Sequence, residues 1–310
     1  MVDRFQKKVV TNQLTLTAGI LISILLWAAG YIIQPIATLW ETIGAYALYA
    51  FIGYLLIVLN KSFSIIRLRA SFQTVIFMLF VGVSPKIHTI YAGNITTLCF
   101  LAALYLCFRS FQLKRTSGFL FHAFMFLGFG CILIPVIIWL IPFIWFACIK
   151  FRSLNIKSFI ASVFGWSIPI GGYAIYLYLN NRWSEFLYKA MIPVTLRDTI
   201  LDNYQFPAVV TLSCLFIVFF VSATHAILNS LDEKVQARVY LNHIIITTSA
   251  LFALMFFFPA DIRYLIPITL LGVSFLFGHF ATLTHSKWSN IFFILVLLCT
   301  IPIFIINLLY

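Results

Sequence analysis

The chain has few side chains that could do acid-base chemistry, since eight acidic residues stand against twenty basic ones. Glu41 and Asp198 lie in polar breaks between apolar runs, where a carboxylate can act as general base toward a hydroxyl. We take both as candidate catalytic residues. Charged and hydrogen-bonding side chains in the same breaks could bind a phosphate. These candidate substrate-binding residues are Lys86, His88, Tyr91, Asn94, Arg182, Arg197 and Arg263.

The elements that must position these residues are apolar helices. Hydrophobic residues make up 63% of the chain and charged residues 9%, so most of its surface must face hydrocarbon. Runs such as GILISILLWAAGYII are apolar on every face, which excludes the alternating strands of an outer-membrane barrel. We therefore expect an all-α, polytopic transmembrane helix bundle that forms a single transmembrane domain over residues 1–310.

The hydropathy pattern predicts about eleven spans, within a range of ten to twelve. If the N-terminus is cytoplasmic, most basic residues fall in inner loops, as the positive-inside rule requires, and the C-terminus lies outside. One long apolar stretch is divided at Gly128 to Gly130. The predicted spans are 13–33, 42–59, 70–84, 94–109, 117–129, 131–149, 158–180, 207–229, 241–258, 264–283 and 289–309.

The longest outer loop, residues 180–206, is predicted to hold an amphipathic helix that lies in the membrane interface and ends at Pro193. Trp183, Phe186 and Met191 recur at helical spacing, with charged residues on the other side. An amphipathic helix beside carboxylates and basic residues at headgroup depth suits a polyprenyl-phosphate donor. Its phosphate would meet basic side chains, and a carboxylate would activate the acceptor.

The polar island SPKIHTIYAGNI, residues 84–95, has two interpretations. Pro85 and Gly93 favour a plain hairpin turn. Alternatively the island forms a phosphate-binding pocket, in which its polar side chains meet Glu41 and the 180–206 loop. Both interpretations stay open at this point.

The sequence predicts no metal site and no cofactor. His225, His243 and His279 could meet only if three helix ends converge, and no HExxH or Cys/His spacing supports them. Nucleotide and serine-nucleophile motifs are absent from the sequence. The net charge of +12 is explained by membrane orientation and anionic lipid headgroups, so we expect no nucleic-acid partner.

The stretch IQPIATLWETIGAY places Glu41 in the first outer loop. In this respect the chain resembles the GT-C class of multi-pass glycosyltransferases and glycan polymerases, whose catalytic acid sits in that loop. The stretch YAGNITTLCFLAALYLCFRSFQ is similar to uncharacterised bacterial multi-pass inner-membrane families. These resemblances imply a bacterial inner-membrane location and, for the first, a catalytic role for Glu41.

Three functions follow from this interpretation. The first is the handling of lipid-linked saccharide at the outer face, with membrane lipids and polyprenyl-phosphate-linked saccharide as ligands. The second is a non-catalytic subunit or scaffold role with other inner-membrane proteins as partners. A transporter or flippase is disfavoured, because no Asp, Glu, Lys or Arg lies near the middle of a predicted span.

Overall fold

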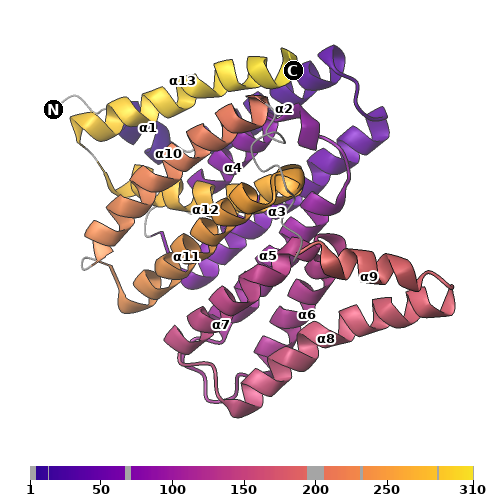
Figure 1. Cartoon of the computed structure of the whole chain (residues 1–310). Helices are drawn as coiled ribbons and strands as arrows, with labels where there is room; N and C mark the ends of the chain where they lie inside the picture. The colour runs from indigo at the N-terminus through magenta and orange to yellow at the C-terminus, as the bar shows by residue number, and fades with distance from the viewer. Residues whose placement is uncertain are drawn as a thin grey trace. The chain divides into compact units, whose positions relative to one another are not determined.

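The computed structural model describes residues 5–12, 14–66, 71–193, 206–230, 233–284 and 286–309, and these residues form helices and turns without a strand (Figure 1). This confirms the all-α fold class. Within the described ranges, eight segments are long and apolar enough to cross a membrane, which is consistent with a multi-pass membrane protein. They are Thr15–Ile33, Leu39–Phe63, Ala92–Arg109, Ile156–Leu179, Phe206–Leu228, Val235–Phe257, Pro259–Leu283 and Lys287–Leu309.

Three further apolar helical segments are shorter, namely Phe72–Gly82, Ser117–Leu133 and Pro135–Lys150. Together with the eight long segments they overlap all the predicted spans. The number of crossings and the orientation of the chain stay predictions, because helix length and composition settle neither.

The helices divide into two compact units. The first comprises residues 1–91, 204–245 and 269–310, and the second comprises residues 92–203 and 246–268. The expectation of a single transmembrane domain stays a prediction. The first unit contains α1 (Phe5–Thr11), α2 (Thr15–Ile33), α3 (Leu39–Phe63), α4 (Phe72–Gly82), η1 (Pro85–Ile87), α10 (Phe206–Leu228) and α13 (Lys287–Leu309).

The second unit contains α5 (Ala92–Arg109), α6 (Ser117–Leu133), η2 (Pro135–Leu140), α7 (Ile141–Lys150), α8 (Ile156–Leu179), α9 (Trp183–Met191) and η4 (Pro259–Asp261). Two long helices, α11 (Val235–Phe257) and α12 (Ile262–Leu283), contribute residues to both units.

In the first unit, α4 is a short helix that is buried along its whole length. Its neighbours approach closely through small residues: a Cβ placed on Gly19 of α2 would lie 2.5 Å from Val75 Cγ1. The Thr74 hydroxyl donates a hydrogen bond of 2.8 Å to the Gly53 carbonyl of α3. Because protein surrounds α4 on all sides, this helix need not match the thickness of a bilayer.

In the second unit, α6 packs against α8 (Figure 1). The two helices approach closely at two glycines. A Cβ on Gly165 would lie 2.2 Å from the carbonyl oxygen of Phe121, and one on Gly128 would lie 2.7 Å from that of Trp166. Small residues at a helix crossing let the two backbones approach in this way.

The predicted division at Gly128 to Gly130 is wrong, because α6 continues through both glycines to Leu133. The helix ends at Ile134, whose backbone is extended (φ −132°, ψ 91°), directly before Pro135. Proline has no N–H to donate and restricts the preceding residue to extended conformations. The glycines serve helix packing, and the proline ends the helix.

Candidate functional site

Glu41 lies in the first turn of α3 and caps that helix. Its carboxylate accepts a hydrogen bond of 3.2 Å from the backbone N–H of Thr38, and the Thr38 hydroxyl accepts one of 3.3 Å from the backbone N–H of Glu41. This reciprocal pair is a capping box, and the negative charge also complements the positive end of the helix dipole. The side chain that resemblance marks as catalytic therefore already has a structural role.

The polar island forms a packed turn around His88. The imidazole stacks on the Trp27 indole with ring centroids 3.8 Å apart, and its Nε2 lies 3.2 Å from the Val81 carbonyl oxygen. Gly30 leaves room for the ring, since a Cβ there would lie 3.3 Å from His88 Nδ1. Burial lowers the pKa of His88 to about 4, so the ring is neutral near pH 7.

The other island residues surround this turn. Lys86 is half-buried in η1, and the Tyr91 hydroxyl lies 3.5 Å from that of Tyr49 on α3. A Cβ on Gly44 of α3 would lie 2.9 Å from the Ile90 side chain, so the first turns of α3 contact the island. These contacts favour the turn interpretation, because they come from ordinary packing of the first unit.

The remaining candidates are Asn94, the last polar residue of the island, and residues elsewhere in the chain. Asn94 is fully buried in the first turn of α5, and Arg263 is exposed in the first turn of α12. Arg182 makes two hydrogen bonds of 2.6 and 2.8 Å to the Glu185 carboxylate at the start of α9. All three belong to the second unit. Arg197 and Asp198 lie outside the described residues.

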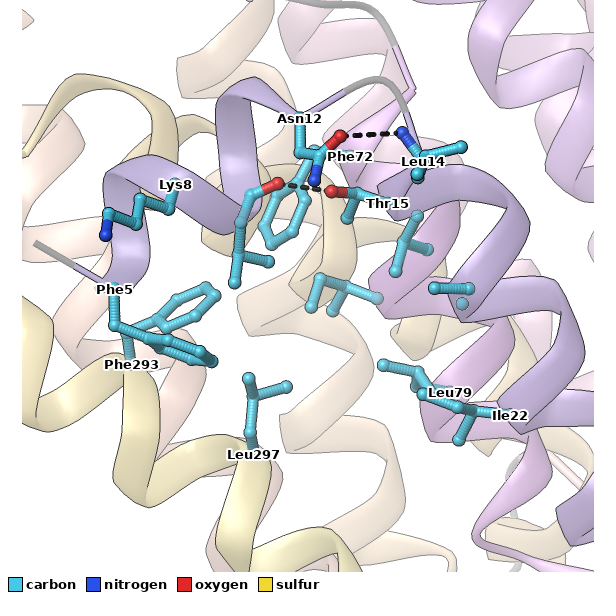
Figure 2. Close-up of a pocket in the computed structure, with 15 residues that line it drawn as sticks. Phe5, Lys8, Asn12, Leu14, Thr15, Ile22, Phe72, Leu79, Phe293 and Leu297 are labelled. Carbon is cyan, nitrogen blue, oxygen red and sulfur yellow. Dashed lines mark hydrogen bonds between the residues drawn. The ribbon is translucent and has the colours of Figure 1, made fainter. Parts of the chain in front are cut away.

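The first unit contains a pocket that is lined by none of the candidate residues that the structure describes. We call it the N-terminal pocket; its volume is about 440 Å³ (Figure 2). Its walls come from α1, α2, α4 and α13. The lining residues are Phe5, Lys8, Val9, Asn12, Leu14, Thr15, Ala18, Gly19, Ile22, Phe72, Val75, Ile76, Leu79, Phe293 and Leu297.

The two ends of the N-terminal pocket differ in chemistry. Lys8, Asn12 and Thr15 lie where α1 leads into α2, whereas Ile22, Leu79 and Leu297 line the other end (Figure 2). From Thr15 to Ile22 the helix rises roughly 10 Å, at about 1.5 Å per residue. We call the end with Lys8, Asn12 and Thr15 the mouth of the pocket and the rest of it the apolar channel.

Hydrogen bonds hold the mouth in shape. The Asn12 side-chain oxygen accepts one of 3.0 Å from the Leu14 backbone N–H, which leaves the amide nitrogen of Asn12 as the donor at the pocket (Figure 2). The Thr15 hydroxyl donates to the Val9 carbonyl. No carboxylate lines the pocket, so within the described chain its polar groups are mainly donors.

Gln6 fixes the α1 wall of the N-terminal pocket. This side chain is 1% exposed, and its amide nitrogen donates to the carbonyls of Ala281 and Thr284 at 2.9 and 3.0 Å. Its oxygen accepts a hydrogen bond of 2.9 Å from the Ser289 hydroxyl, and its backbone N–H donates to the Asn290 side chain at 2.8 Å. These bonds attach α1 to the turn between α12 and α13.

The sequence interpretation did not identify the N-terminal pocket, because it explained the basic residues only by membrane orientation and anionic lipid headgroups. A local signal exists. Phe5 and Val9 are four apart, as are Lys8 and Asn12, so a short helix would carry an apolar stripe beside a polar one. That pattern indicates an amphipathic helix ahead of the first span, though its partners α4 and α13 are far away in sequence.

A smaller pocket of about 310 Å³ lies in the second unit, where the end of α9 meets the turn between α11 and α12. We call it the α9 pocket. Tyr188, Phe257 and Phe258 supply aromatic side chains to its lining, and Asp261 supplies a carboxylate. The helix predicted in the 180–206 loop is thus present as α9 and ends before Pro193. Its position in the membrane interface stays a prediction.

A buried acid-histidine pair lies in the first unit. The Glu233 carboxylate oxygen is 3.6 Å from His279 Nε2, with these side chains 4% and 1% exposed. The His225 ring lies 6.4 Å from that of His279. Two of the three histidines considered from sequence are therefore neighbours. Even so, the part of the chain that the structure describes has no group of three or more potential ligands able to hold a metal ion.

Comparison of the chain with protein-family models, with curated proteins and with solved structures finds no match. The resemblances to GT-C enzymes and to inner-membrane families therefore stay predictions.

Proposed function

We propose that the protein is a multi-pass membrane protein that binds the hydrocarbon chain of a membrane lipid in the N-terminal pocket. The observation that carries this proposal is the pocket itself: an apolar channel of about 440 Å³ whose polar lining residues gather at one end. A membrane lipid has the same division between an apolar chain and a polar head. The predicted bacterial inner-membrane location, eleven crossings and cytoplasmic N-terminus are part of this proposal.

Access to the N-terminal pocket supports a lipid rather than a water-soluble ligand. Leu14 and Ile22 line the pocket and are also exposed, with 68% and 48% of their surface accessible. Ile22 belongs to α2, and Leu14 directly precedes this helix. Only 22% of the α2 span is buried within the protein. In a membrane, such a helix faces lipid, so a chain can enter sideways from the bilayer.

The test is native mass spectrometry of the protein extracted in a mild detergent. The wild type should retain about one lipid per chain. Ala18→Trp places a large ring in the N-terminal pocket and should remove that lipid. Ala28→Trp is the matched control, because Ala28 is exposed on the same helix and does not line the pocket. It should retain lipid as the wild type does.

A second measurement keeps the proposal testable if Ala18→Trp fails to fold. A photoactivatable fatty-acyl lipid, incorporated into the membrane and crosslinked to the wild-type chain, should label Ile22 or Leu79 above Ile32, which is exposed outside the pocket. Equal labelling of these positions, or equal lipid retention in the two tryptophan variants, would refute lipid-chain binding.

We propose the handling of lipid-linked saccharide as a second candidate function, supported by the α9 pocket. Aromatic side chains can cover the apolar face of a sugar ring, while a carboxylate accepts hydrogen bonds from its hydroxyls. Asp261 provides that carboxylate, and Arg263 follows two positions later with its basic group exposed. The subunit and transporter alternatives have no comparable feature in their favour.

This second function predicts that a saccharide-bearing lipid copurifies with the protein and that Asp261→Asn diminishes its retention. Glu185→Gln is the control, because Glu185 is an acid of the same unit that pairs with Arg182. Undiminished retention in Asp261→Asn would count against the α9 pocket as the saccharide site.

A further inference from the structure

We infer that the N-terminal pocket selects a phospholipid with an anionic headgroup, whose phosphate lies at Lys8 and Asn12. This inference rests on the proposed lipid-chain binding and adds the chemical class of the ligand. It follows from the donors and charges at the mouth of the pocket.

The mouth provides a positive charge and hydrogen-bond donors. Lys8 lines the pocket with an exposed side chain that extends toward Phe5 in Figure 2, and rotation of this flexible side chain brings its ammonium group, with three N–H donors, to the mouth. The Asn12 oxygen is engaged by the Leu14 N–H, so the side chain turns its amide donor to the pocket. A phosphate diester presents acceptor oxygens and a negative charge, which are the complementary groups.

The lining also disfavours a cationic headgroup. Among the described residues that line the N-terminal pocket none is a carboxylate, so a choline or ethanolamine group finds no counter-charge in this lining. The ammonium of Lys8 would repel it. A phosphatidylglycerol headgroup has no cationic group and avoids this repulsion.

The position of the mouth agrees with an interfacial phosphate. Lys8 belongs to α1 and Asn12 follows this helix directly, ahead of the long apolar helix α2. Basic residues that flank a membrane span attract anionic lipids. Gln6 holds α1 in place through its bonds to the α12–α13 turn, so Lys8 and Asn12 keep their positions relative to the apolar channel.

The experiment compares two phospholipids with identical acyl chains. Delipidated full-length protein in detergent is titrated with phosphatidylglycerol or phosphatidylcholine, and bound lipid is counted by native mass spectrometry. The wild type should prefer phosphatidylglycerol by roughly fivefold, the effect of about one basic residue. Lys8→Gln should abolish the preference while lipid binding persists, and Lys8→Arg should restore it.

Lys7→Gln is the matched control, since it removes the same charge from the adjacent residue of α1, which does not line the pocket. It should keep the preference. A loss as large as that of Lys8→Gln would indicate a general surface charge and overturn the inference. If oleate competes more strongly than phosphatidylglycerol, the mouth binds a carboxylate in preference to a phosphate. That result would also overturn the inference.

The result separates this inference from the proposed function. Equal binding of the two phospholipids by the wild type, with binding still lost in Ala18→Trp, would refute headgroup selection and leave chain binding intact. Absence of both lipids from the wild type would refute both proposals.

Discussion

The hydroxyl of Ser289 donates a hydrogen bond of 2.9 Å to the side-chain oxygen of Gln6, although 283 positions separate the two residues. Both side chains are buried. This bond joins the two ends of the chain in the first unit, because α1 and α13 begin at Phe5 and Lys287. The α1 wall of the N-terminal pocket therefore depends on a contact between distant parts of the sequence.

Gln6→Leu should destabilise the protein by about 2–3 kcal/mol, because it leaves the carbonyls of Ala281 and Thr284 without the buried Gln6 amide donor and removes one of the two hydrogen bonds of the Ser289 hydroxyl. Thermal unfolding in detergent measures the effect. Thr11→Ala is the control on the same helix, since Thr11 is exposed and bonds only to the Lys7 carbonyl of its own turn. Similar losses in the two variants would contradict an anchoring role for Gln6.

Glu41→Gln should leave the free energy of unfolding within about 0.5 kcal/mol of wild type, because Gln also completes a capping box. Glu41→Ala removes the acceptor for the Thr38 N–H and should cost about 0.5–1 kcal/mol. Thermal unfolding of the three proteins gives the comparison. If Glu41→Gln instead abolished turnover of a lipid-linked saccharide at unchanged stability, the carboxylate would be catalytic as well as structural.

Sequence periodicity and composition predicted the all-α class and the positions of the apolar helices, because burial in hydrocarbon constrains every residue of a span. The sequence interpretation misplaced the helix break near residue 130, where the glycines serve helix packing and Pro135 ends the helix. Both glycine and proline can interrupt a helix, so the sequence alone did not show which of them ends α6. The packing role of Gly128 becomes visible only through its neighbour Trp166.

The candidate site was less accessible to sequence. Polar residues were grouped by predicted membrane side, which says nothing about how side chains pair. Glu41 bonds to Thr38, Arg182 to Glu185, and His88 stacks on Trp27. The N-terminal pocket depends on Phe293 meeting both Phe5 and Phe72, and such contacts between distant segments leave no local pattern.

The stability of the protein should decrease as the pH falls from about 6.5 to 4, in part because of His88. Burial lowers the pKa of His88 from 6.5 to about 4 in the folded protein. Between these values the unfolded chain binds the proton and the folded chain does not, so acid favours unfolding. The full contribution, about 3 kcal/mol, is present above pH 6.5 and is lost on approach to pH 4.

Thermal unfolding of wild type and His88→Gln at pH 7 and pH 5 tests this. The variant has no ring to protonate, so its melting temperature should change less between the two pH values. His122→Gln is the control, because His122 is exposed and bonds only to the Gly118 carbonyl of its own helix. A pH response of His88→Gln equal to that of the wild type would assign the acid sensitivity to other groups.

Two glycines of α8 should respond oppositely to the same substitution. A Cβ on Gly165 would lie 2.2 Å from the Phe121 carbonyl oxygen, which belongs to the backbone of α6 and cannot rotate away. Gly165→Ala must therefore separate the two helices, at a cost of about 1–3 kcal/mol. Gly171 has no atom within 4 Å of its Cβ position, so Gly171→Ala removes only the conformational freedom of glycine and should stabilise α8 by about 0.5–1 kcal/mol. Thermal unfolding of the two variants in one detergent measures the difference, and equal melting temperatures would refute close α6–α8 packing at Gly165.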